Sequence, residues 1–197
     1  MTRFAERDGY SLTELMIALA LGVTLSVAAV PEYLSTIDDV RASGATHYIS
    51  GRLQRARMEA VLRSAMVGVQ FTQSGSSYSY TVYVDGNGNG ILTRDIQRGV
   101  DKPIAAAERL PSQFTGVEFG AIPGLPPVDP GGTAPGTDPI RLGSGNIASF
   151  SAAGTSSSGT VYIRSRRDAQ YAVRIFGETG KTRMLKFEPR TRVWREL

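Results

Sequence analysis

The chain contains no cysteine and a single histidine, His47, among its 197 residues. The absence of cysteine excludes a disulfide framework, thiol catalysis and a thiolate zinc site. No Ser-His-Asp order, pair of catalytic carboxylates or cluster of metal ligands is apparent in the sequence, so we expect neither an enzyme nor a bound cofactor. The net charge of +4 permits an anionic partner without requiring one.

A long apolar run lies near the N-terminus. Residues 15–30 read LMIALALGVTLSVAAV, and with residues 10–14 the run has 21 residues, close to the roughly 20 that a helix needs to cross a bilayer. The following PEYLSTIDDV lacks the small-residue cleavage pattern of a secretory signal peptide, so we expect the segment to stay on the protein. Arg3 and Arg7 precede the run and acidic residues follow it, which predicts a cytoplasmic N-terminus and an exported remainder.

Glu14 is unusual at the start of a membrane segment. A carboxylate near the middle of a bilayer costs about 2.5–3.5 kcal/mol, and the cost is lower one turn inside the boundary. Two interpretations are open. Either the side chain reaches the membrane interface, or another molecule supplies a partner charge.

The whole segment RDGYSLTELMIALALGVTLSVAAVP, residues 7–31, resembles the class III signal of type IV pilins and pseudopilins. The resemblance implies that prepilin peptidase cuts after Gly9 and that the new N-terminal residue, Tyr10, is N-methylated, although the family usually has Phe there. It also implies that Glu14 pairs with the N-terminal amine of a neighbouring subunit during assembly. An ion pair in an apolar bundle adds little net stability but strongly penalises wrong registers.

Residues 32–64 are amphipathic, with apolar residues at helical spacing and arginines between them. They predict one long helix over residues 11–64, weakened near Pro31 and Gly44, whose apolar stripe packs on a globular domain. The segment LQRARMEAVLRS also resembles the end of the first helix in the GspH/FimT branch of the superfamily, at Arg57, Glu59, Ala60 and Arg63.

The remaining chain reads as β structure. Residues 67–71 and 78–84 predict an antiparallel hairpin, and further strands are expected at residues 114–119, 147–151, 160–164, 171–176 and 183–187. The segment FSAAGTSSSGTVYI, residues 150–163, again resembles the GspH/FimT branch. The Pro/Gly-rich residues 120–145 predict a long mobile surface loop without a ladder or helix.

Residues 84–95, VDGNGNGILTRD, resemble the start of an EF-hand calcium loop, with oxygen-bearing side chains at Asp85, Asn87, Asn89 and Asp95. Ile96 stands where the twelfth position needs a bidentate Glu, and Asp95 comes one residue early. A turn after a strand explains the Asn and Gly residues equally well. A phosphate loop fits less well, because no helix is expected to open directly after the glycines.

Positive charge gathers at the C-terminus, where residues 164–197 hold ten Lys or Arg against four Asp or Glu. Beside aromatic residues this charge could bind a DNA backbone, and the candidate residues are Lys181, Arg183, Lys186, Arg190 and Arg192. GKTR, residues 180–183, resembles the Gly-Arg-x-Arg motif of FimT-like DNA-uptake pilins, but Lys181 lacks the planar fork of Arg. A solvated sheet face, or contact with acidic neighbours, explains the same charge.

These observations predict an α+β, pilin-like fold, in which a long N-terminal α-helix packs on a twisted antiparallel β-sheet domain. The expected parts are a cleaved leader (1–9), a transmembrane and assembly half of the helix (10–31), an amphipathic half (32–64) and a globular domain (65–197). The expected role is that of a minor subunit of a type II secretion pseudopilus or a type IV pilus, with DNA capture as the alternative. Its expected partners are other pilin or pseudopilin subunits, prepilin peptidase and the inner membrane, which would leave the globular domain in the periplasm.

Overall fold

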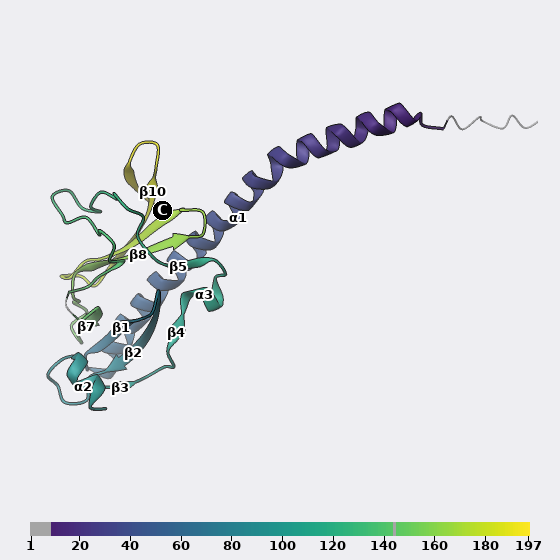
Figure 1. Ribbon diagram of the computed structural model, residues 1–197. Coiled ribbons are helices and arrows are strands. Elements are labelled where there is room, and N and C mark those ends of the chain that lie inside the picture. The colour runs from purple at the N-terminus through teal and green to yellow at the C-terminus, as the bar shows by residue number, and fades with distance from the viewer. Residues whose placement is uncertain (1–8, 144) are drawn as a thin grey trace, which may run out of the picture. The chain divides into compact units, whose positions relative to one another are not determined.

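The computed structural model describes residues 9–143 and 145–197, and the chain divides into two compact units between Ile37 and Asp38. Helix α1 (Leu12–Arg63) runs through this division, so its second half belongs to the same unit as the strands. Antiparallel sheets follow the helix along the chain (Figure 1). This order of elements confirms the expected α+β, pilin-like fold.

Side chains at its own N-terminus start helix α1. Ser11 Oγ accepts the N–H of Thr13 at 3.2 Å, and Glu14 Oε2 accepts the N–H of Ser11 at 2.9 Å. The bond from Ser11 to Glu14 is one half of a capping box, and Ser11 Oγ caps the N–H of Thr13 in place of that of Glu14. Both bonds satisfy backbone donors that the first turn leaves without partners. The helix continues through Pro31 and ends where Ser64 adopts a left-handed φ of 51°.

The strands of the described chain form two antiparallel sheets. In sheet A the order is β3 (Lys102–Pro103), β2 (Ser77–Val84), β1 (Val67–Ser74) and β7 (Ile147–Phe150), and β4 (Glu108–Arg109) also pairs with β2. In sheet B the order is β11 (Val193–Glu196), β10 (Thr182–Glu188), β9 (Gln170–Ile175), β8 (Gly159–Ser165) and β5 (Val117–Phe119), and β6 (Ile140–Arg141) pairs with β8. The short helices are α2 (Thr93–Gln97) and α3 (Leu110–Gln113).

The predicted hairpin is confirmed and is longer than expected. Strands β1 and β2 pair from Val67 opposite Val84 to Ser74 opposite Ser77, which leaves a two-residue turn. Gly75 in this turn has a φ of 62°, a conformation that glycine adopts at little cost.

Two expectations about the middle of the chain are wrong. The strand expected from residue 114 begins only at Val117, because Phe114 lies at the C-terminal end of α3. The Pro/Gly-rich segment was expected to hold no ladder, yet Ile140 and Arg141 pair with strand β8. A neighbouring strand thus stabilises a two-residue ladder that the local sequence does not predict.

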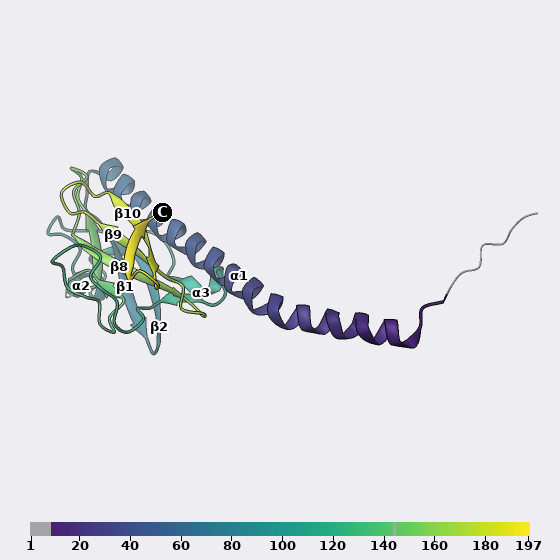
Figure 2. The ribbon, with the colours of Figure 1, turned by 90° about the horizontal axis from the view of Figure 1, so that it is seen from above.

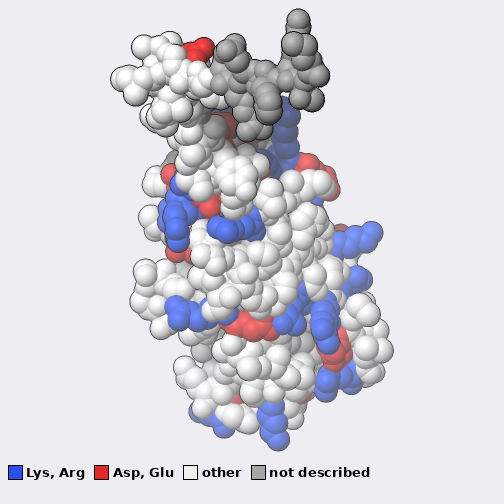
Figure 3. Space-filling model, turned by 90° about the vertical axis from the view of Figure 1, so that its right-hand side faces the viewer, with Lys and Arg blue, Asp and Glu red and all other residues white. Residues whose placement is uncertain are grey.

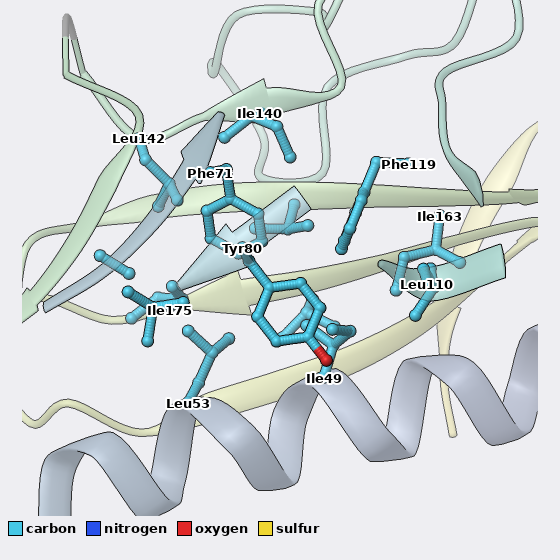
Figure 4. Packing of buried hydrophobic residues seen from close by; sticks show 14 of the residues in the cluster. Ile49, Leu53, Phe71, Tyr80, Leu110, Phe119, Ile140, Leu142, Ile163 and Ile175 are labelled. Atoms are coloured by element: carbon cyan, nitrogen blue, oxygen red, sulfur yellow. The ribbon is translucent and has the colours of Figure 1, made fainter. Parts of the chain in front are cut away.

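The main core lies between α1 and the two sheets. Small and branched residues recur on one face of the helix, at 0–2 % exposure: Ala42, Ala45, Ile49, Leu53, Ala56 and Ala60. Ile49 and Leu53 point toward Phe71 and Tyr80 of sheet A and toward Ile163 and Ile175 of sheet B (Figure 4). The second half of α1 therefore lies along the strands, as the view from above also shows (Figure 2).

A polar network also joins α1 to sheet A. The hydroxyls of Tyr48 and Tyr80 donate to Glu108 Oε2 at 2.6 and 2.8 Å, and the Arg52 guanidinium forms an ion pair with Glu108 Oε1. Burial alone would raise the pKa of Glu108, but the hydrogen bonds from Arg52 and the two tyrosines lower it to about 2. The carboxylate therefore stays ionised in the folded protein down to low pH.

We expect the Glu108 network to make stability depend on pH. The pKa of Glu108 is lowered from an ordinary value near 4.5 to about 2, so its contribution is present above pH 4.5 and is lost as the pH falls toward 2. Glu108→Gln should lower the free energy of unfolding by about 2–3 kcal/mol at pH 7. Denaturant unfolding of the full chain in detergent, from pH 7 to pH 2, should show wild type and variant converging at low pH.

The matched control is Glu118→Gln, which removes a more exposed carboxylate whose side chain is 43 % exposed beside Arg164. This change should alter stability by less than about 1 kcal/mol. Equal losses of unfolding free energy in the two variants would contradict the role assigned to Glu108. So would a stability difference between wild type and Glu108→Gln that does not decrease as the pH falls.

Candidate functional site

The first half of α1 presents exposed apolar side chains. Its large hydrophobic residues from Leu12 to Val30 are between 53 % and 77 % exposed. By length and composition, α1 is the one described helix apolar enough to cross a membrane, with a mean hydropathy of 2.0 over its most apolar window. Exposed apolar surface of this extent is unfavourable in water and needs lipid or other protein.

The residues predicted for processing and assembly lie at the start of this segment. Gly9 and Tyr10 precede the helix in non-helical chain, and Tyr10 is 90 % exposed. The rest of the expected leader, with Arg3 and Arg7, lies outside the described residues. Glu14 is exposed, and its carboxylate takes part in the capping box with Ser11. Sequence reasoning missed this local role, although the S-x-x-E spacing signals it.

In the suggested calcium loop, backbone N–H groups of the loop itself donate to the carboxylate of Asp85. Asp85 accepts the N–H groups of Asn87, Gly88 and Gly90 at 3.0, 2.8 and 2.7 Å. Burial would raise the pKa of Asp85, but these backbone N–H groups lower it below its ordinary value. The carboxylate oxygens thus already have donors, as in an Asx turn.

A second buried aspartate completes this loop. Asp101 is 1 % exposed, and its carboxylate accepts the N–H groups of Gly86 and Leu92 at 3.2 and 3.1 Å. Asp95 accepts the side-chain amide of Asn89 at 3.0 Å. Within the described ranges, no group of three or more His, Cys, Asp or Glu residues is placed to hold a metal ion. The hydrogen bonds account for the Asp and Asn residues as parts of a structural turn.

The predicted DNA-binding residues do not form one free basic surface. Arg183 binds Asp129 of the Pro/Gly-rich segment, with Nη2 at 3.1 Å from Oδ1, and Arg174 binds the other oxygen with Nε at 2.5 Å. Both guanidinium groups also lie over the ring of Phe176. Arg183 is therefore paired with an acid distant in sequence.

Two acidic residues of α1 pair with basic residues of the C-terminal part. Asp39 accepts Lys186 Nζ and the Tyr171 hydroxyl, both at 2.8 Å, and Asp38 pairs with Arg167 at 2.5 Å. Burial raises the pKa of Tyr171, and its hydrogen bond to Asp39 raises it further. These contacts join the helix to sheet B, much as Glu108 joins it to sheet A.

The other predicted basic residues are exposed. Lys181, Arg190 and Arg192 lie on the surface, and Arg192 donates to the carbonyl of Gly124 at 2.8 Å. On the face shown in Figure 3, Lys and Arg lie between acidic and uncharged residues and form no continuous patch. No local pattern in the sequence indicated which cations are neutralised, because their partners lie 45 to 147 positions away.

The GKTR turn is docked onto α1. Gln54 donates to the carbonyl of Gly180 at 3.0 Å, and Arg57 Nε donates to the carbonyl of Gly154 at 3.0 Å. A Cβ at position 180 would lie 2.5 Å from that Gly154 oxygen and 2.8 Å from Arg57 Nε. Residues from three separate sequence motifs thus meet here, at a contact too close for any side chain at position 180.

The family model described as "Type II transport protein GspH" matches residues 45–179, more than half of the chain. The match begins within α1 and ends just before Gly180, so it leaves out the apolar segment and the last 18 residues of the basic C-terminal part. No curated protein and no solved structure matches the chain.

We expect Gly180→Ala to destabilise the fold more than Gly75→Ala. Both glycines have left-handed φ values, 61° and 62°, so the backbone cost of about 1 kcal/mol is common to both changes. At Gly75 an added Cβ meets nothing within 4 Å, whereas at Gly180 it overlaps Gly154 and Arg57. Thermal unfolding should show a further loss of about 1–3 kcal/mol for Gly180→Ala. Equal effects would mean that the turn is not held against α1.

Proposed function

Because the chain belongs to the GspH family of type II transport proteins, we propose that it is a minor, membrane-anchored pseudopilin that is built into a type II secretion pseudopilus. The observation that carries this proposal is the exposed apolar half of α1, which continues into a compact unit that contains the whole GspH match. A structural role of this kind needs no catalytic centre. Incorporation into a type IV pilus uses the same features and is the closest variant of the proposal.

The apolar segment would be covered in two environments in turn. Before assembly the bilayer solvates it, since its length suits a hydrocarbon core about 30 Å thick. After assembly the helices of neighbouring subunits replace the lipid. We place the N-terminus in the cytoplasm, the helix in the inner membrane and the unit from Asp38 in the periplasm, on the basis of Arg3 and Arg7 before the segment.

We propose that prepilin peptidase cuts after Gly9 and that Tyr10 is then N-methylated. The support is that both residues lie in exposed, non-helical chain directly before α1, where a protease can bind an extended backbone. A Cβ on Gly9 would meet nothing within 4 Å among the described residues, so no described contact requires glycine there. Recognition by the peptidase then accounts for the glycine.

We expect Gly9→Leu to leave the chain uncut and Glu14→Leu to leave processing intact while assembly fails. Glu14→Gln separates the two roles of this residue, because glutamine retains the capping box but carries no charge. If the carboxylate pairs with the N-terminal amine of a neighbour, Glu14→Gln should impair assembly as severely as Glu14→Leu. The measurements are mass spectrometry of the N-terminus and the amount of chain recovered in sheared pseudopili.

Normal assembly of Glu14→Gln would assign the residue to helix capping alone. Normal maturation of Gly9→Leu would remove the proposed cleavage site. Thr24→Val serves as the control. Among the described residues the hydroxyl of Thr24 bonds to the carbonyls of Ala20 and Leu21 in its own helix, so the change should alter neither readout.

Capture of DNA is the alternative function, and it now rests on fewer residues than the sequence suggested. The excess of ten basic over four acidic residues in the C-terminal part favours it, as does the exposure of Lys181, Arg190 and Arg192. The ion pairs of Arg183 with Asp129 and of Lys186 with Asp39 weaken it. A DNA site would therefore depend on the exposed cations.

If DNA binds, we expect Lys181→Ala/Arg190→Ala to weaken binding by about tenfold and to reduce its dependence on salt, because each phosphate contact releases counterions. A mobility-shift assay on the fragment 32–197 across a salt series tests this. Arg94→Ala/Arg98→Ala removes the same charge from another exposed site and should have little effect. Absence of any shift at low salt would remove the alternative.

A further inference from the structure

Part of the Pro/Gly-rich segment lies across the outer face of sheet B. We name residues 121–130, AIPGLPPVDP, the strap. Its Leu125 is 4 % exposed and packs in a small cluster with Tyr162, Ala172 and Phe187, and Trp194 lies at the cluster's edge. Side chains alternate along a strand, so these residues of sheet B face away from the main core.

Side chains of sheet B and of the turn between β10 and β11 hold the strap's backbone. Trp194 Nε1 donates to the carbonyl of Pro126 at 3.1 Å, and Arg192 donates to the carbonyl of Gly124 at 2.8 Å. Gln170 Oε1 accepts the N–H of Ile122 at 3.0 Å. An indole N–H that donates to a proline carbonyl, next to aromatic rings, is an arrangement that can bind an extended proline-rich peptide.

Charge adds a third type of contact. Asp129 of the strap lies between Arg174 and Arg183, so two cations face one carboxylate. Arg183 Nε is buried and finds no acceptor within the described residues. The sheet thus offers an acidic ligand more positive charge and more donors than the strap uses.

The contacts of the strap are distinct from those of the main core. Its cluster is separate from the core between α1 and the sheets. From residue 121 to 130, the described hydrogen bonds to sheet B and its β10–β11 turn all involve side chains of those elements, so no strand ladder holds the strap. Gly120 precedes the strap, and Gly131 follows it with a φ of 76°, a left-handed conformation that glycine adopts at little cost.

We propose that this face of sheet B is a docking site for an extended, proline-containing segment with an acidic residue on another protein, and that the strap is a self-ligand which that segment replaces. The inference uses contacts within the unit from Asp38 alone and does not depend on the proposed place in a pseudopilus. The occupant is defined by the strap itself. It needs an apolar residue and two prolines followed by a carboxylate, matching Leu125, the carbonyl of Pro126 and Asp129.

The test uses a labelled peptide of residues 121–131, AIPGLPPVDPG, and the full chain in detergent. In the variant Leu125→Ala/Asp129→Asn the strap loses its apolar and acidic anchors. This variant should bind the peptide about tenfold or more tightly than wild type, because the tethered strap of wild type competes at a high effective concentration. A peptide carrying the same two changes should not bind, and the chain variant Glu118→Gln should behave as wild type. Fluorescence anisotropy of the peptide gives the affinities.

Trp194 gives a second readout, because it is the one tryptophan of the chain. Its emission should shift to longer wavelength in the double variant and return when the peptide binds. A double variant that is folded but does not bind the peptide would overturn the proposal. Loss of cooperative unfolding in the double variant would also overturn it, because the strap would then be part of the core. Binding of a single-stranded oligonucleotide in place of the peptide, or wild-type dimers that Leu125→Ala abolishes, would also overturn it by assigning the face to another occupant.

Discussion

The close approach of helix α1 to both sheets is the interaction on which the rest of the structure depends. Alanines at positions 42, 45, 56 and 60 let the strands come near the helix axis, and Ile49 and Leu53 fill the space between the sheets. Burial of this apolar face contributes a large favourable free energy of folding, and this contribution does not depend on direction. Directional contacts then set the register, through Glu108 to sheet A and through Asp38 and Asp39 to sheet B.

The same helix serves two different surroundings along its length. From Leu12 to Leu34 its large apolar side chains are exposed, and from Ala42 to Ala60 one face is covered by the sheets. Glu14 stands at the start of the exposed part and already has a partner in Ser11. The capping box does not exclude a role in assembly, because a carboxylate has several acceptor positions and can accept a second donor.

Charge pairing over long sequence distances changes how the basic C-terminus is understood. Arg174 and Arg183 share Asp129, and Lys186 holds Asp39, so part of the positive charge stabilises the fold and is no longer free for a ligand. The contacts with Asp129 also hold the strap against the outer face of sheet B. The pairing of Arg174 and Arg183 with Asp129 thus weakens the hypothesis of DNA binding and supports the proposed peptide site.

Local physical rules in the sequence alone determined the long helix, the capping spacing of Ser11 and Glu14, the hairpin between β1 and β2 and the apolar character of the first segment. Each of these depends on residues a few positions apart, through periodicity, turn chemistry or side-chain capping. Only the tertiary structure decided the two-residue ladder of β6, the closeness of Gly180 to Arg57, the partners of Arg183 and Lys186, and the position of the strap. These features join residues far apart in the chain, and their free energy comes from packing and charge neutralisation that no local pattern encodes.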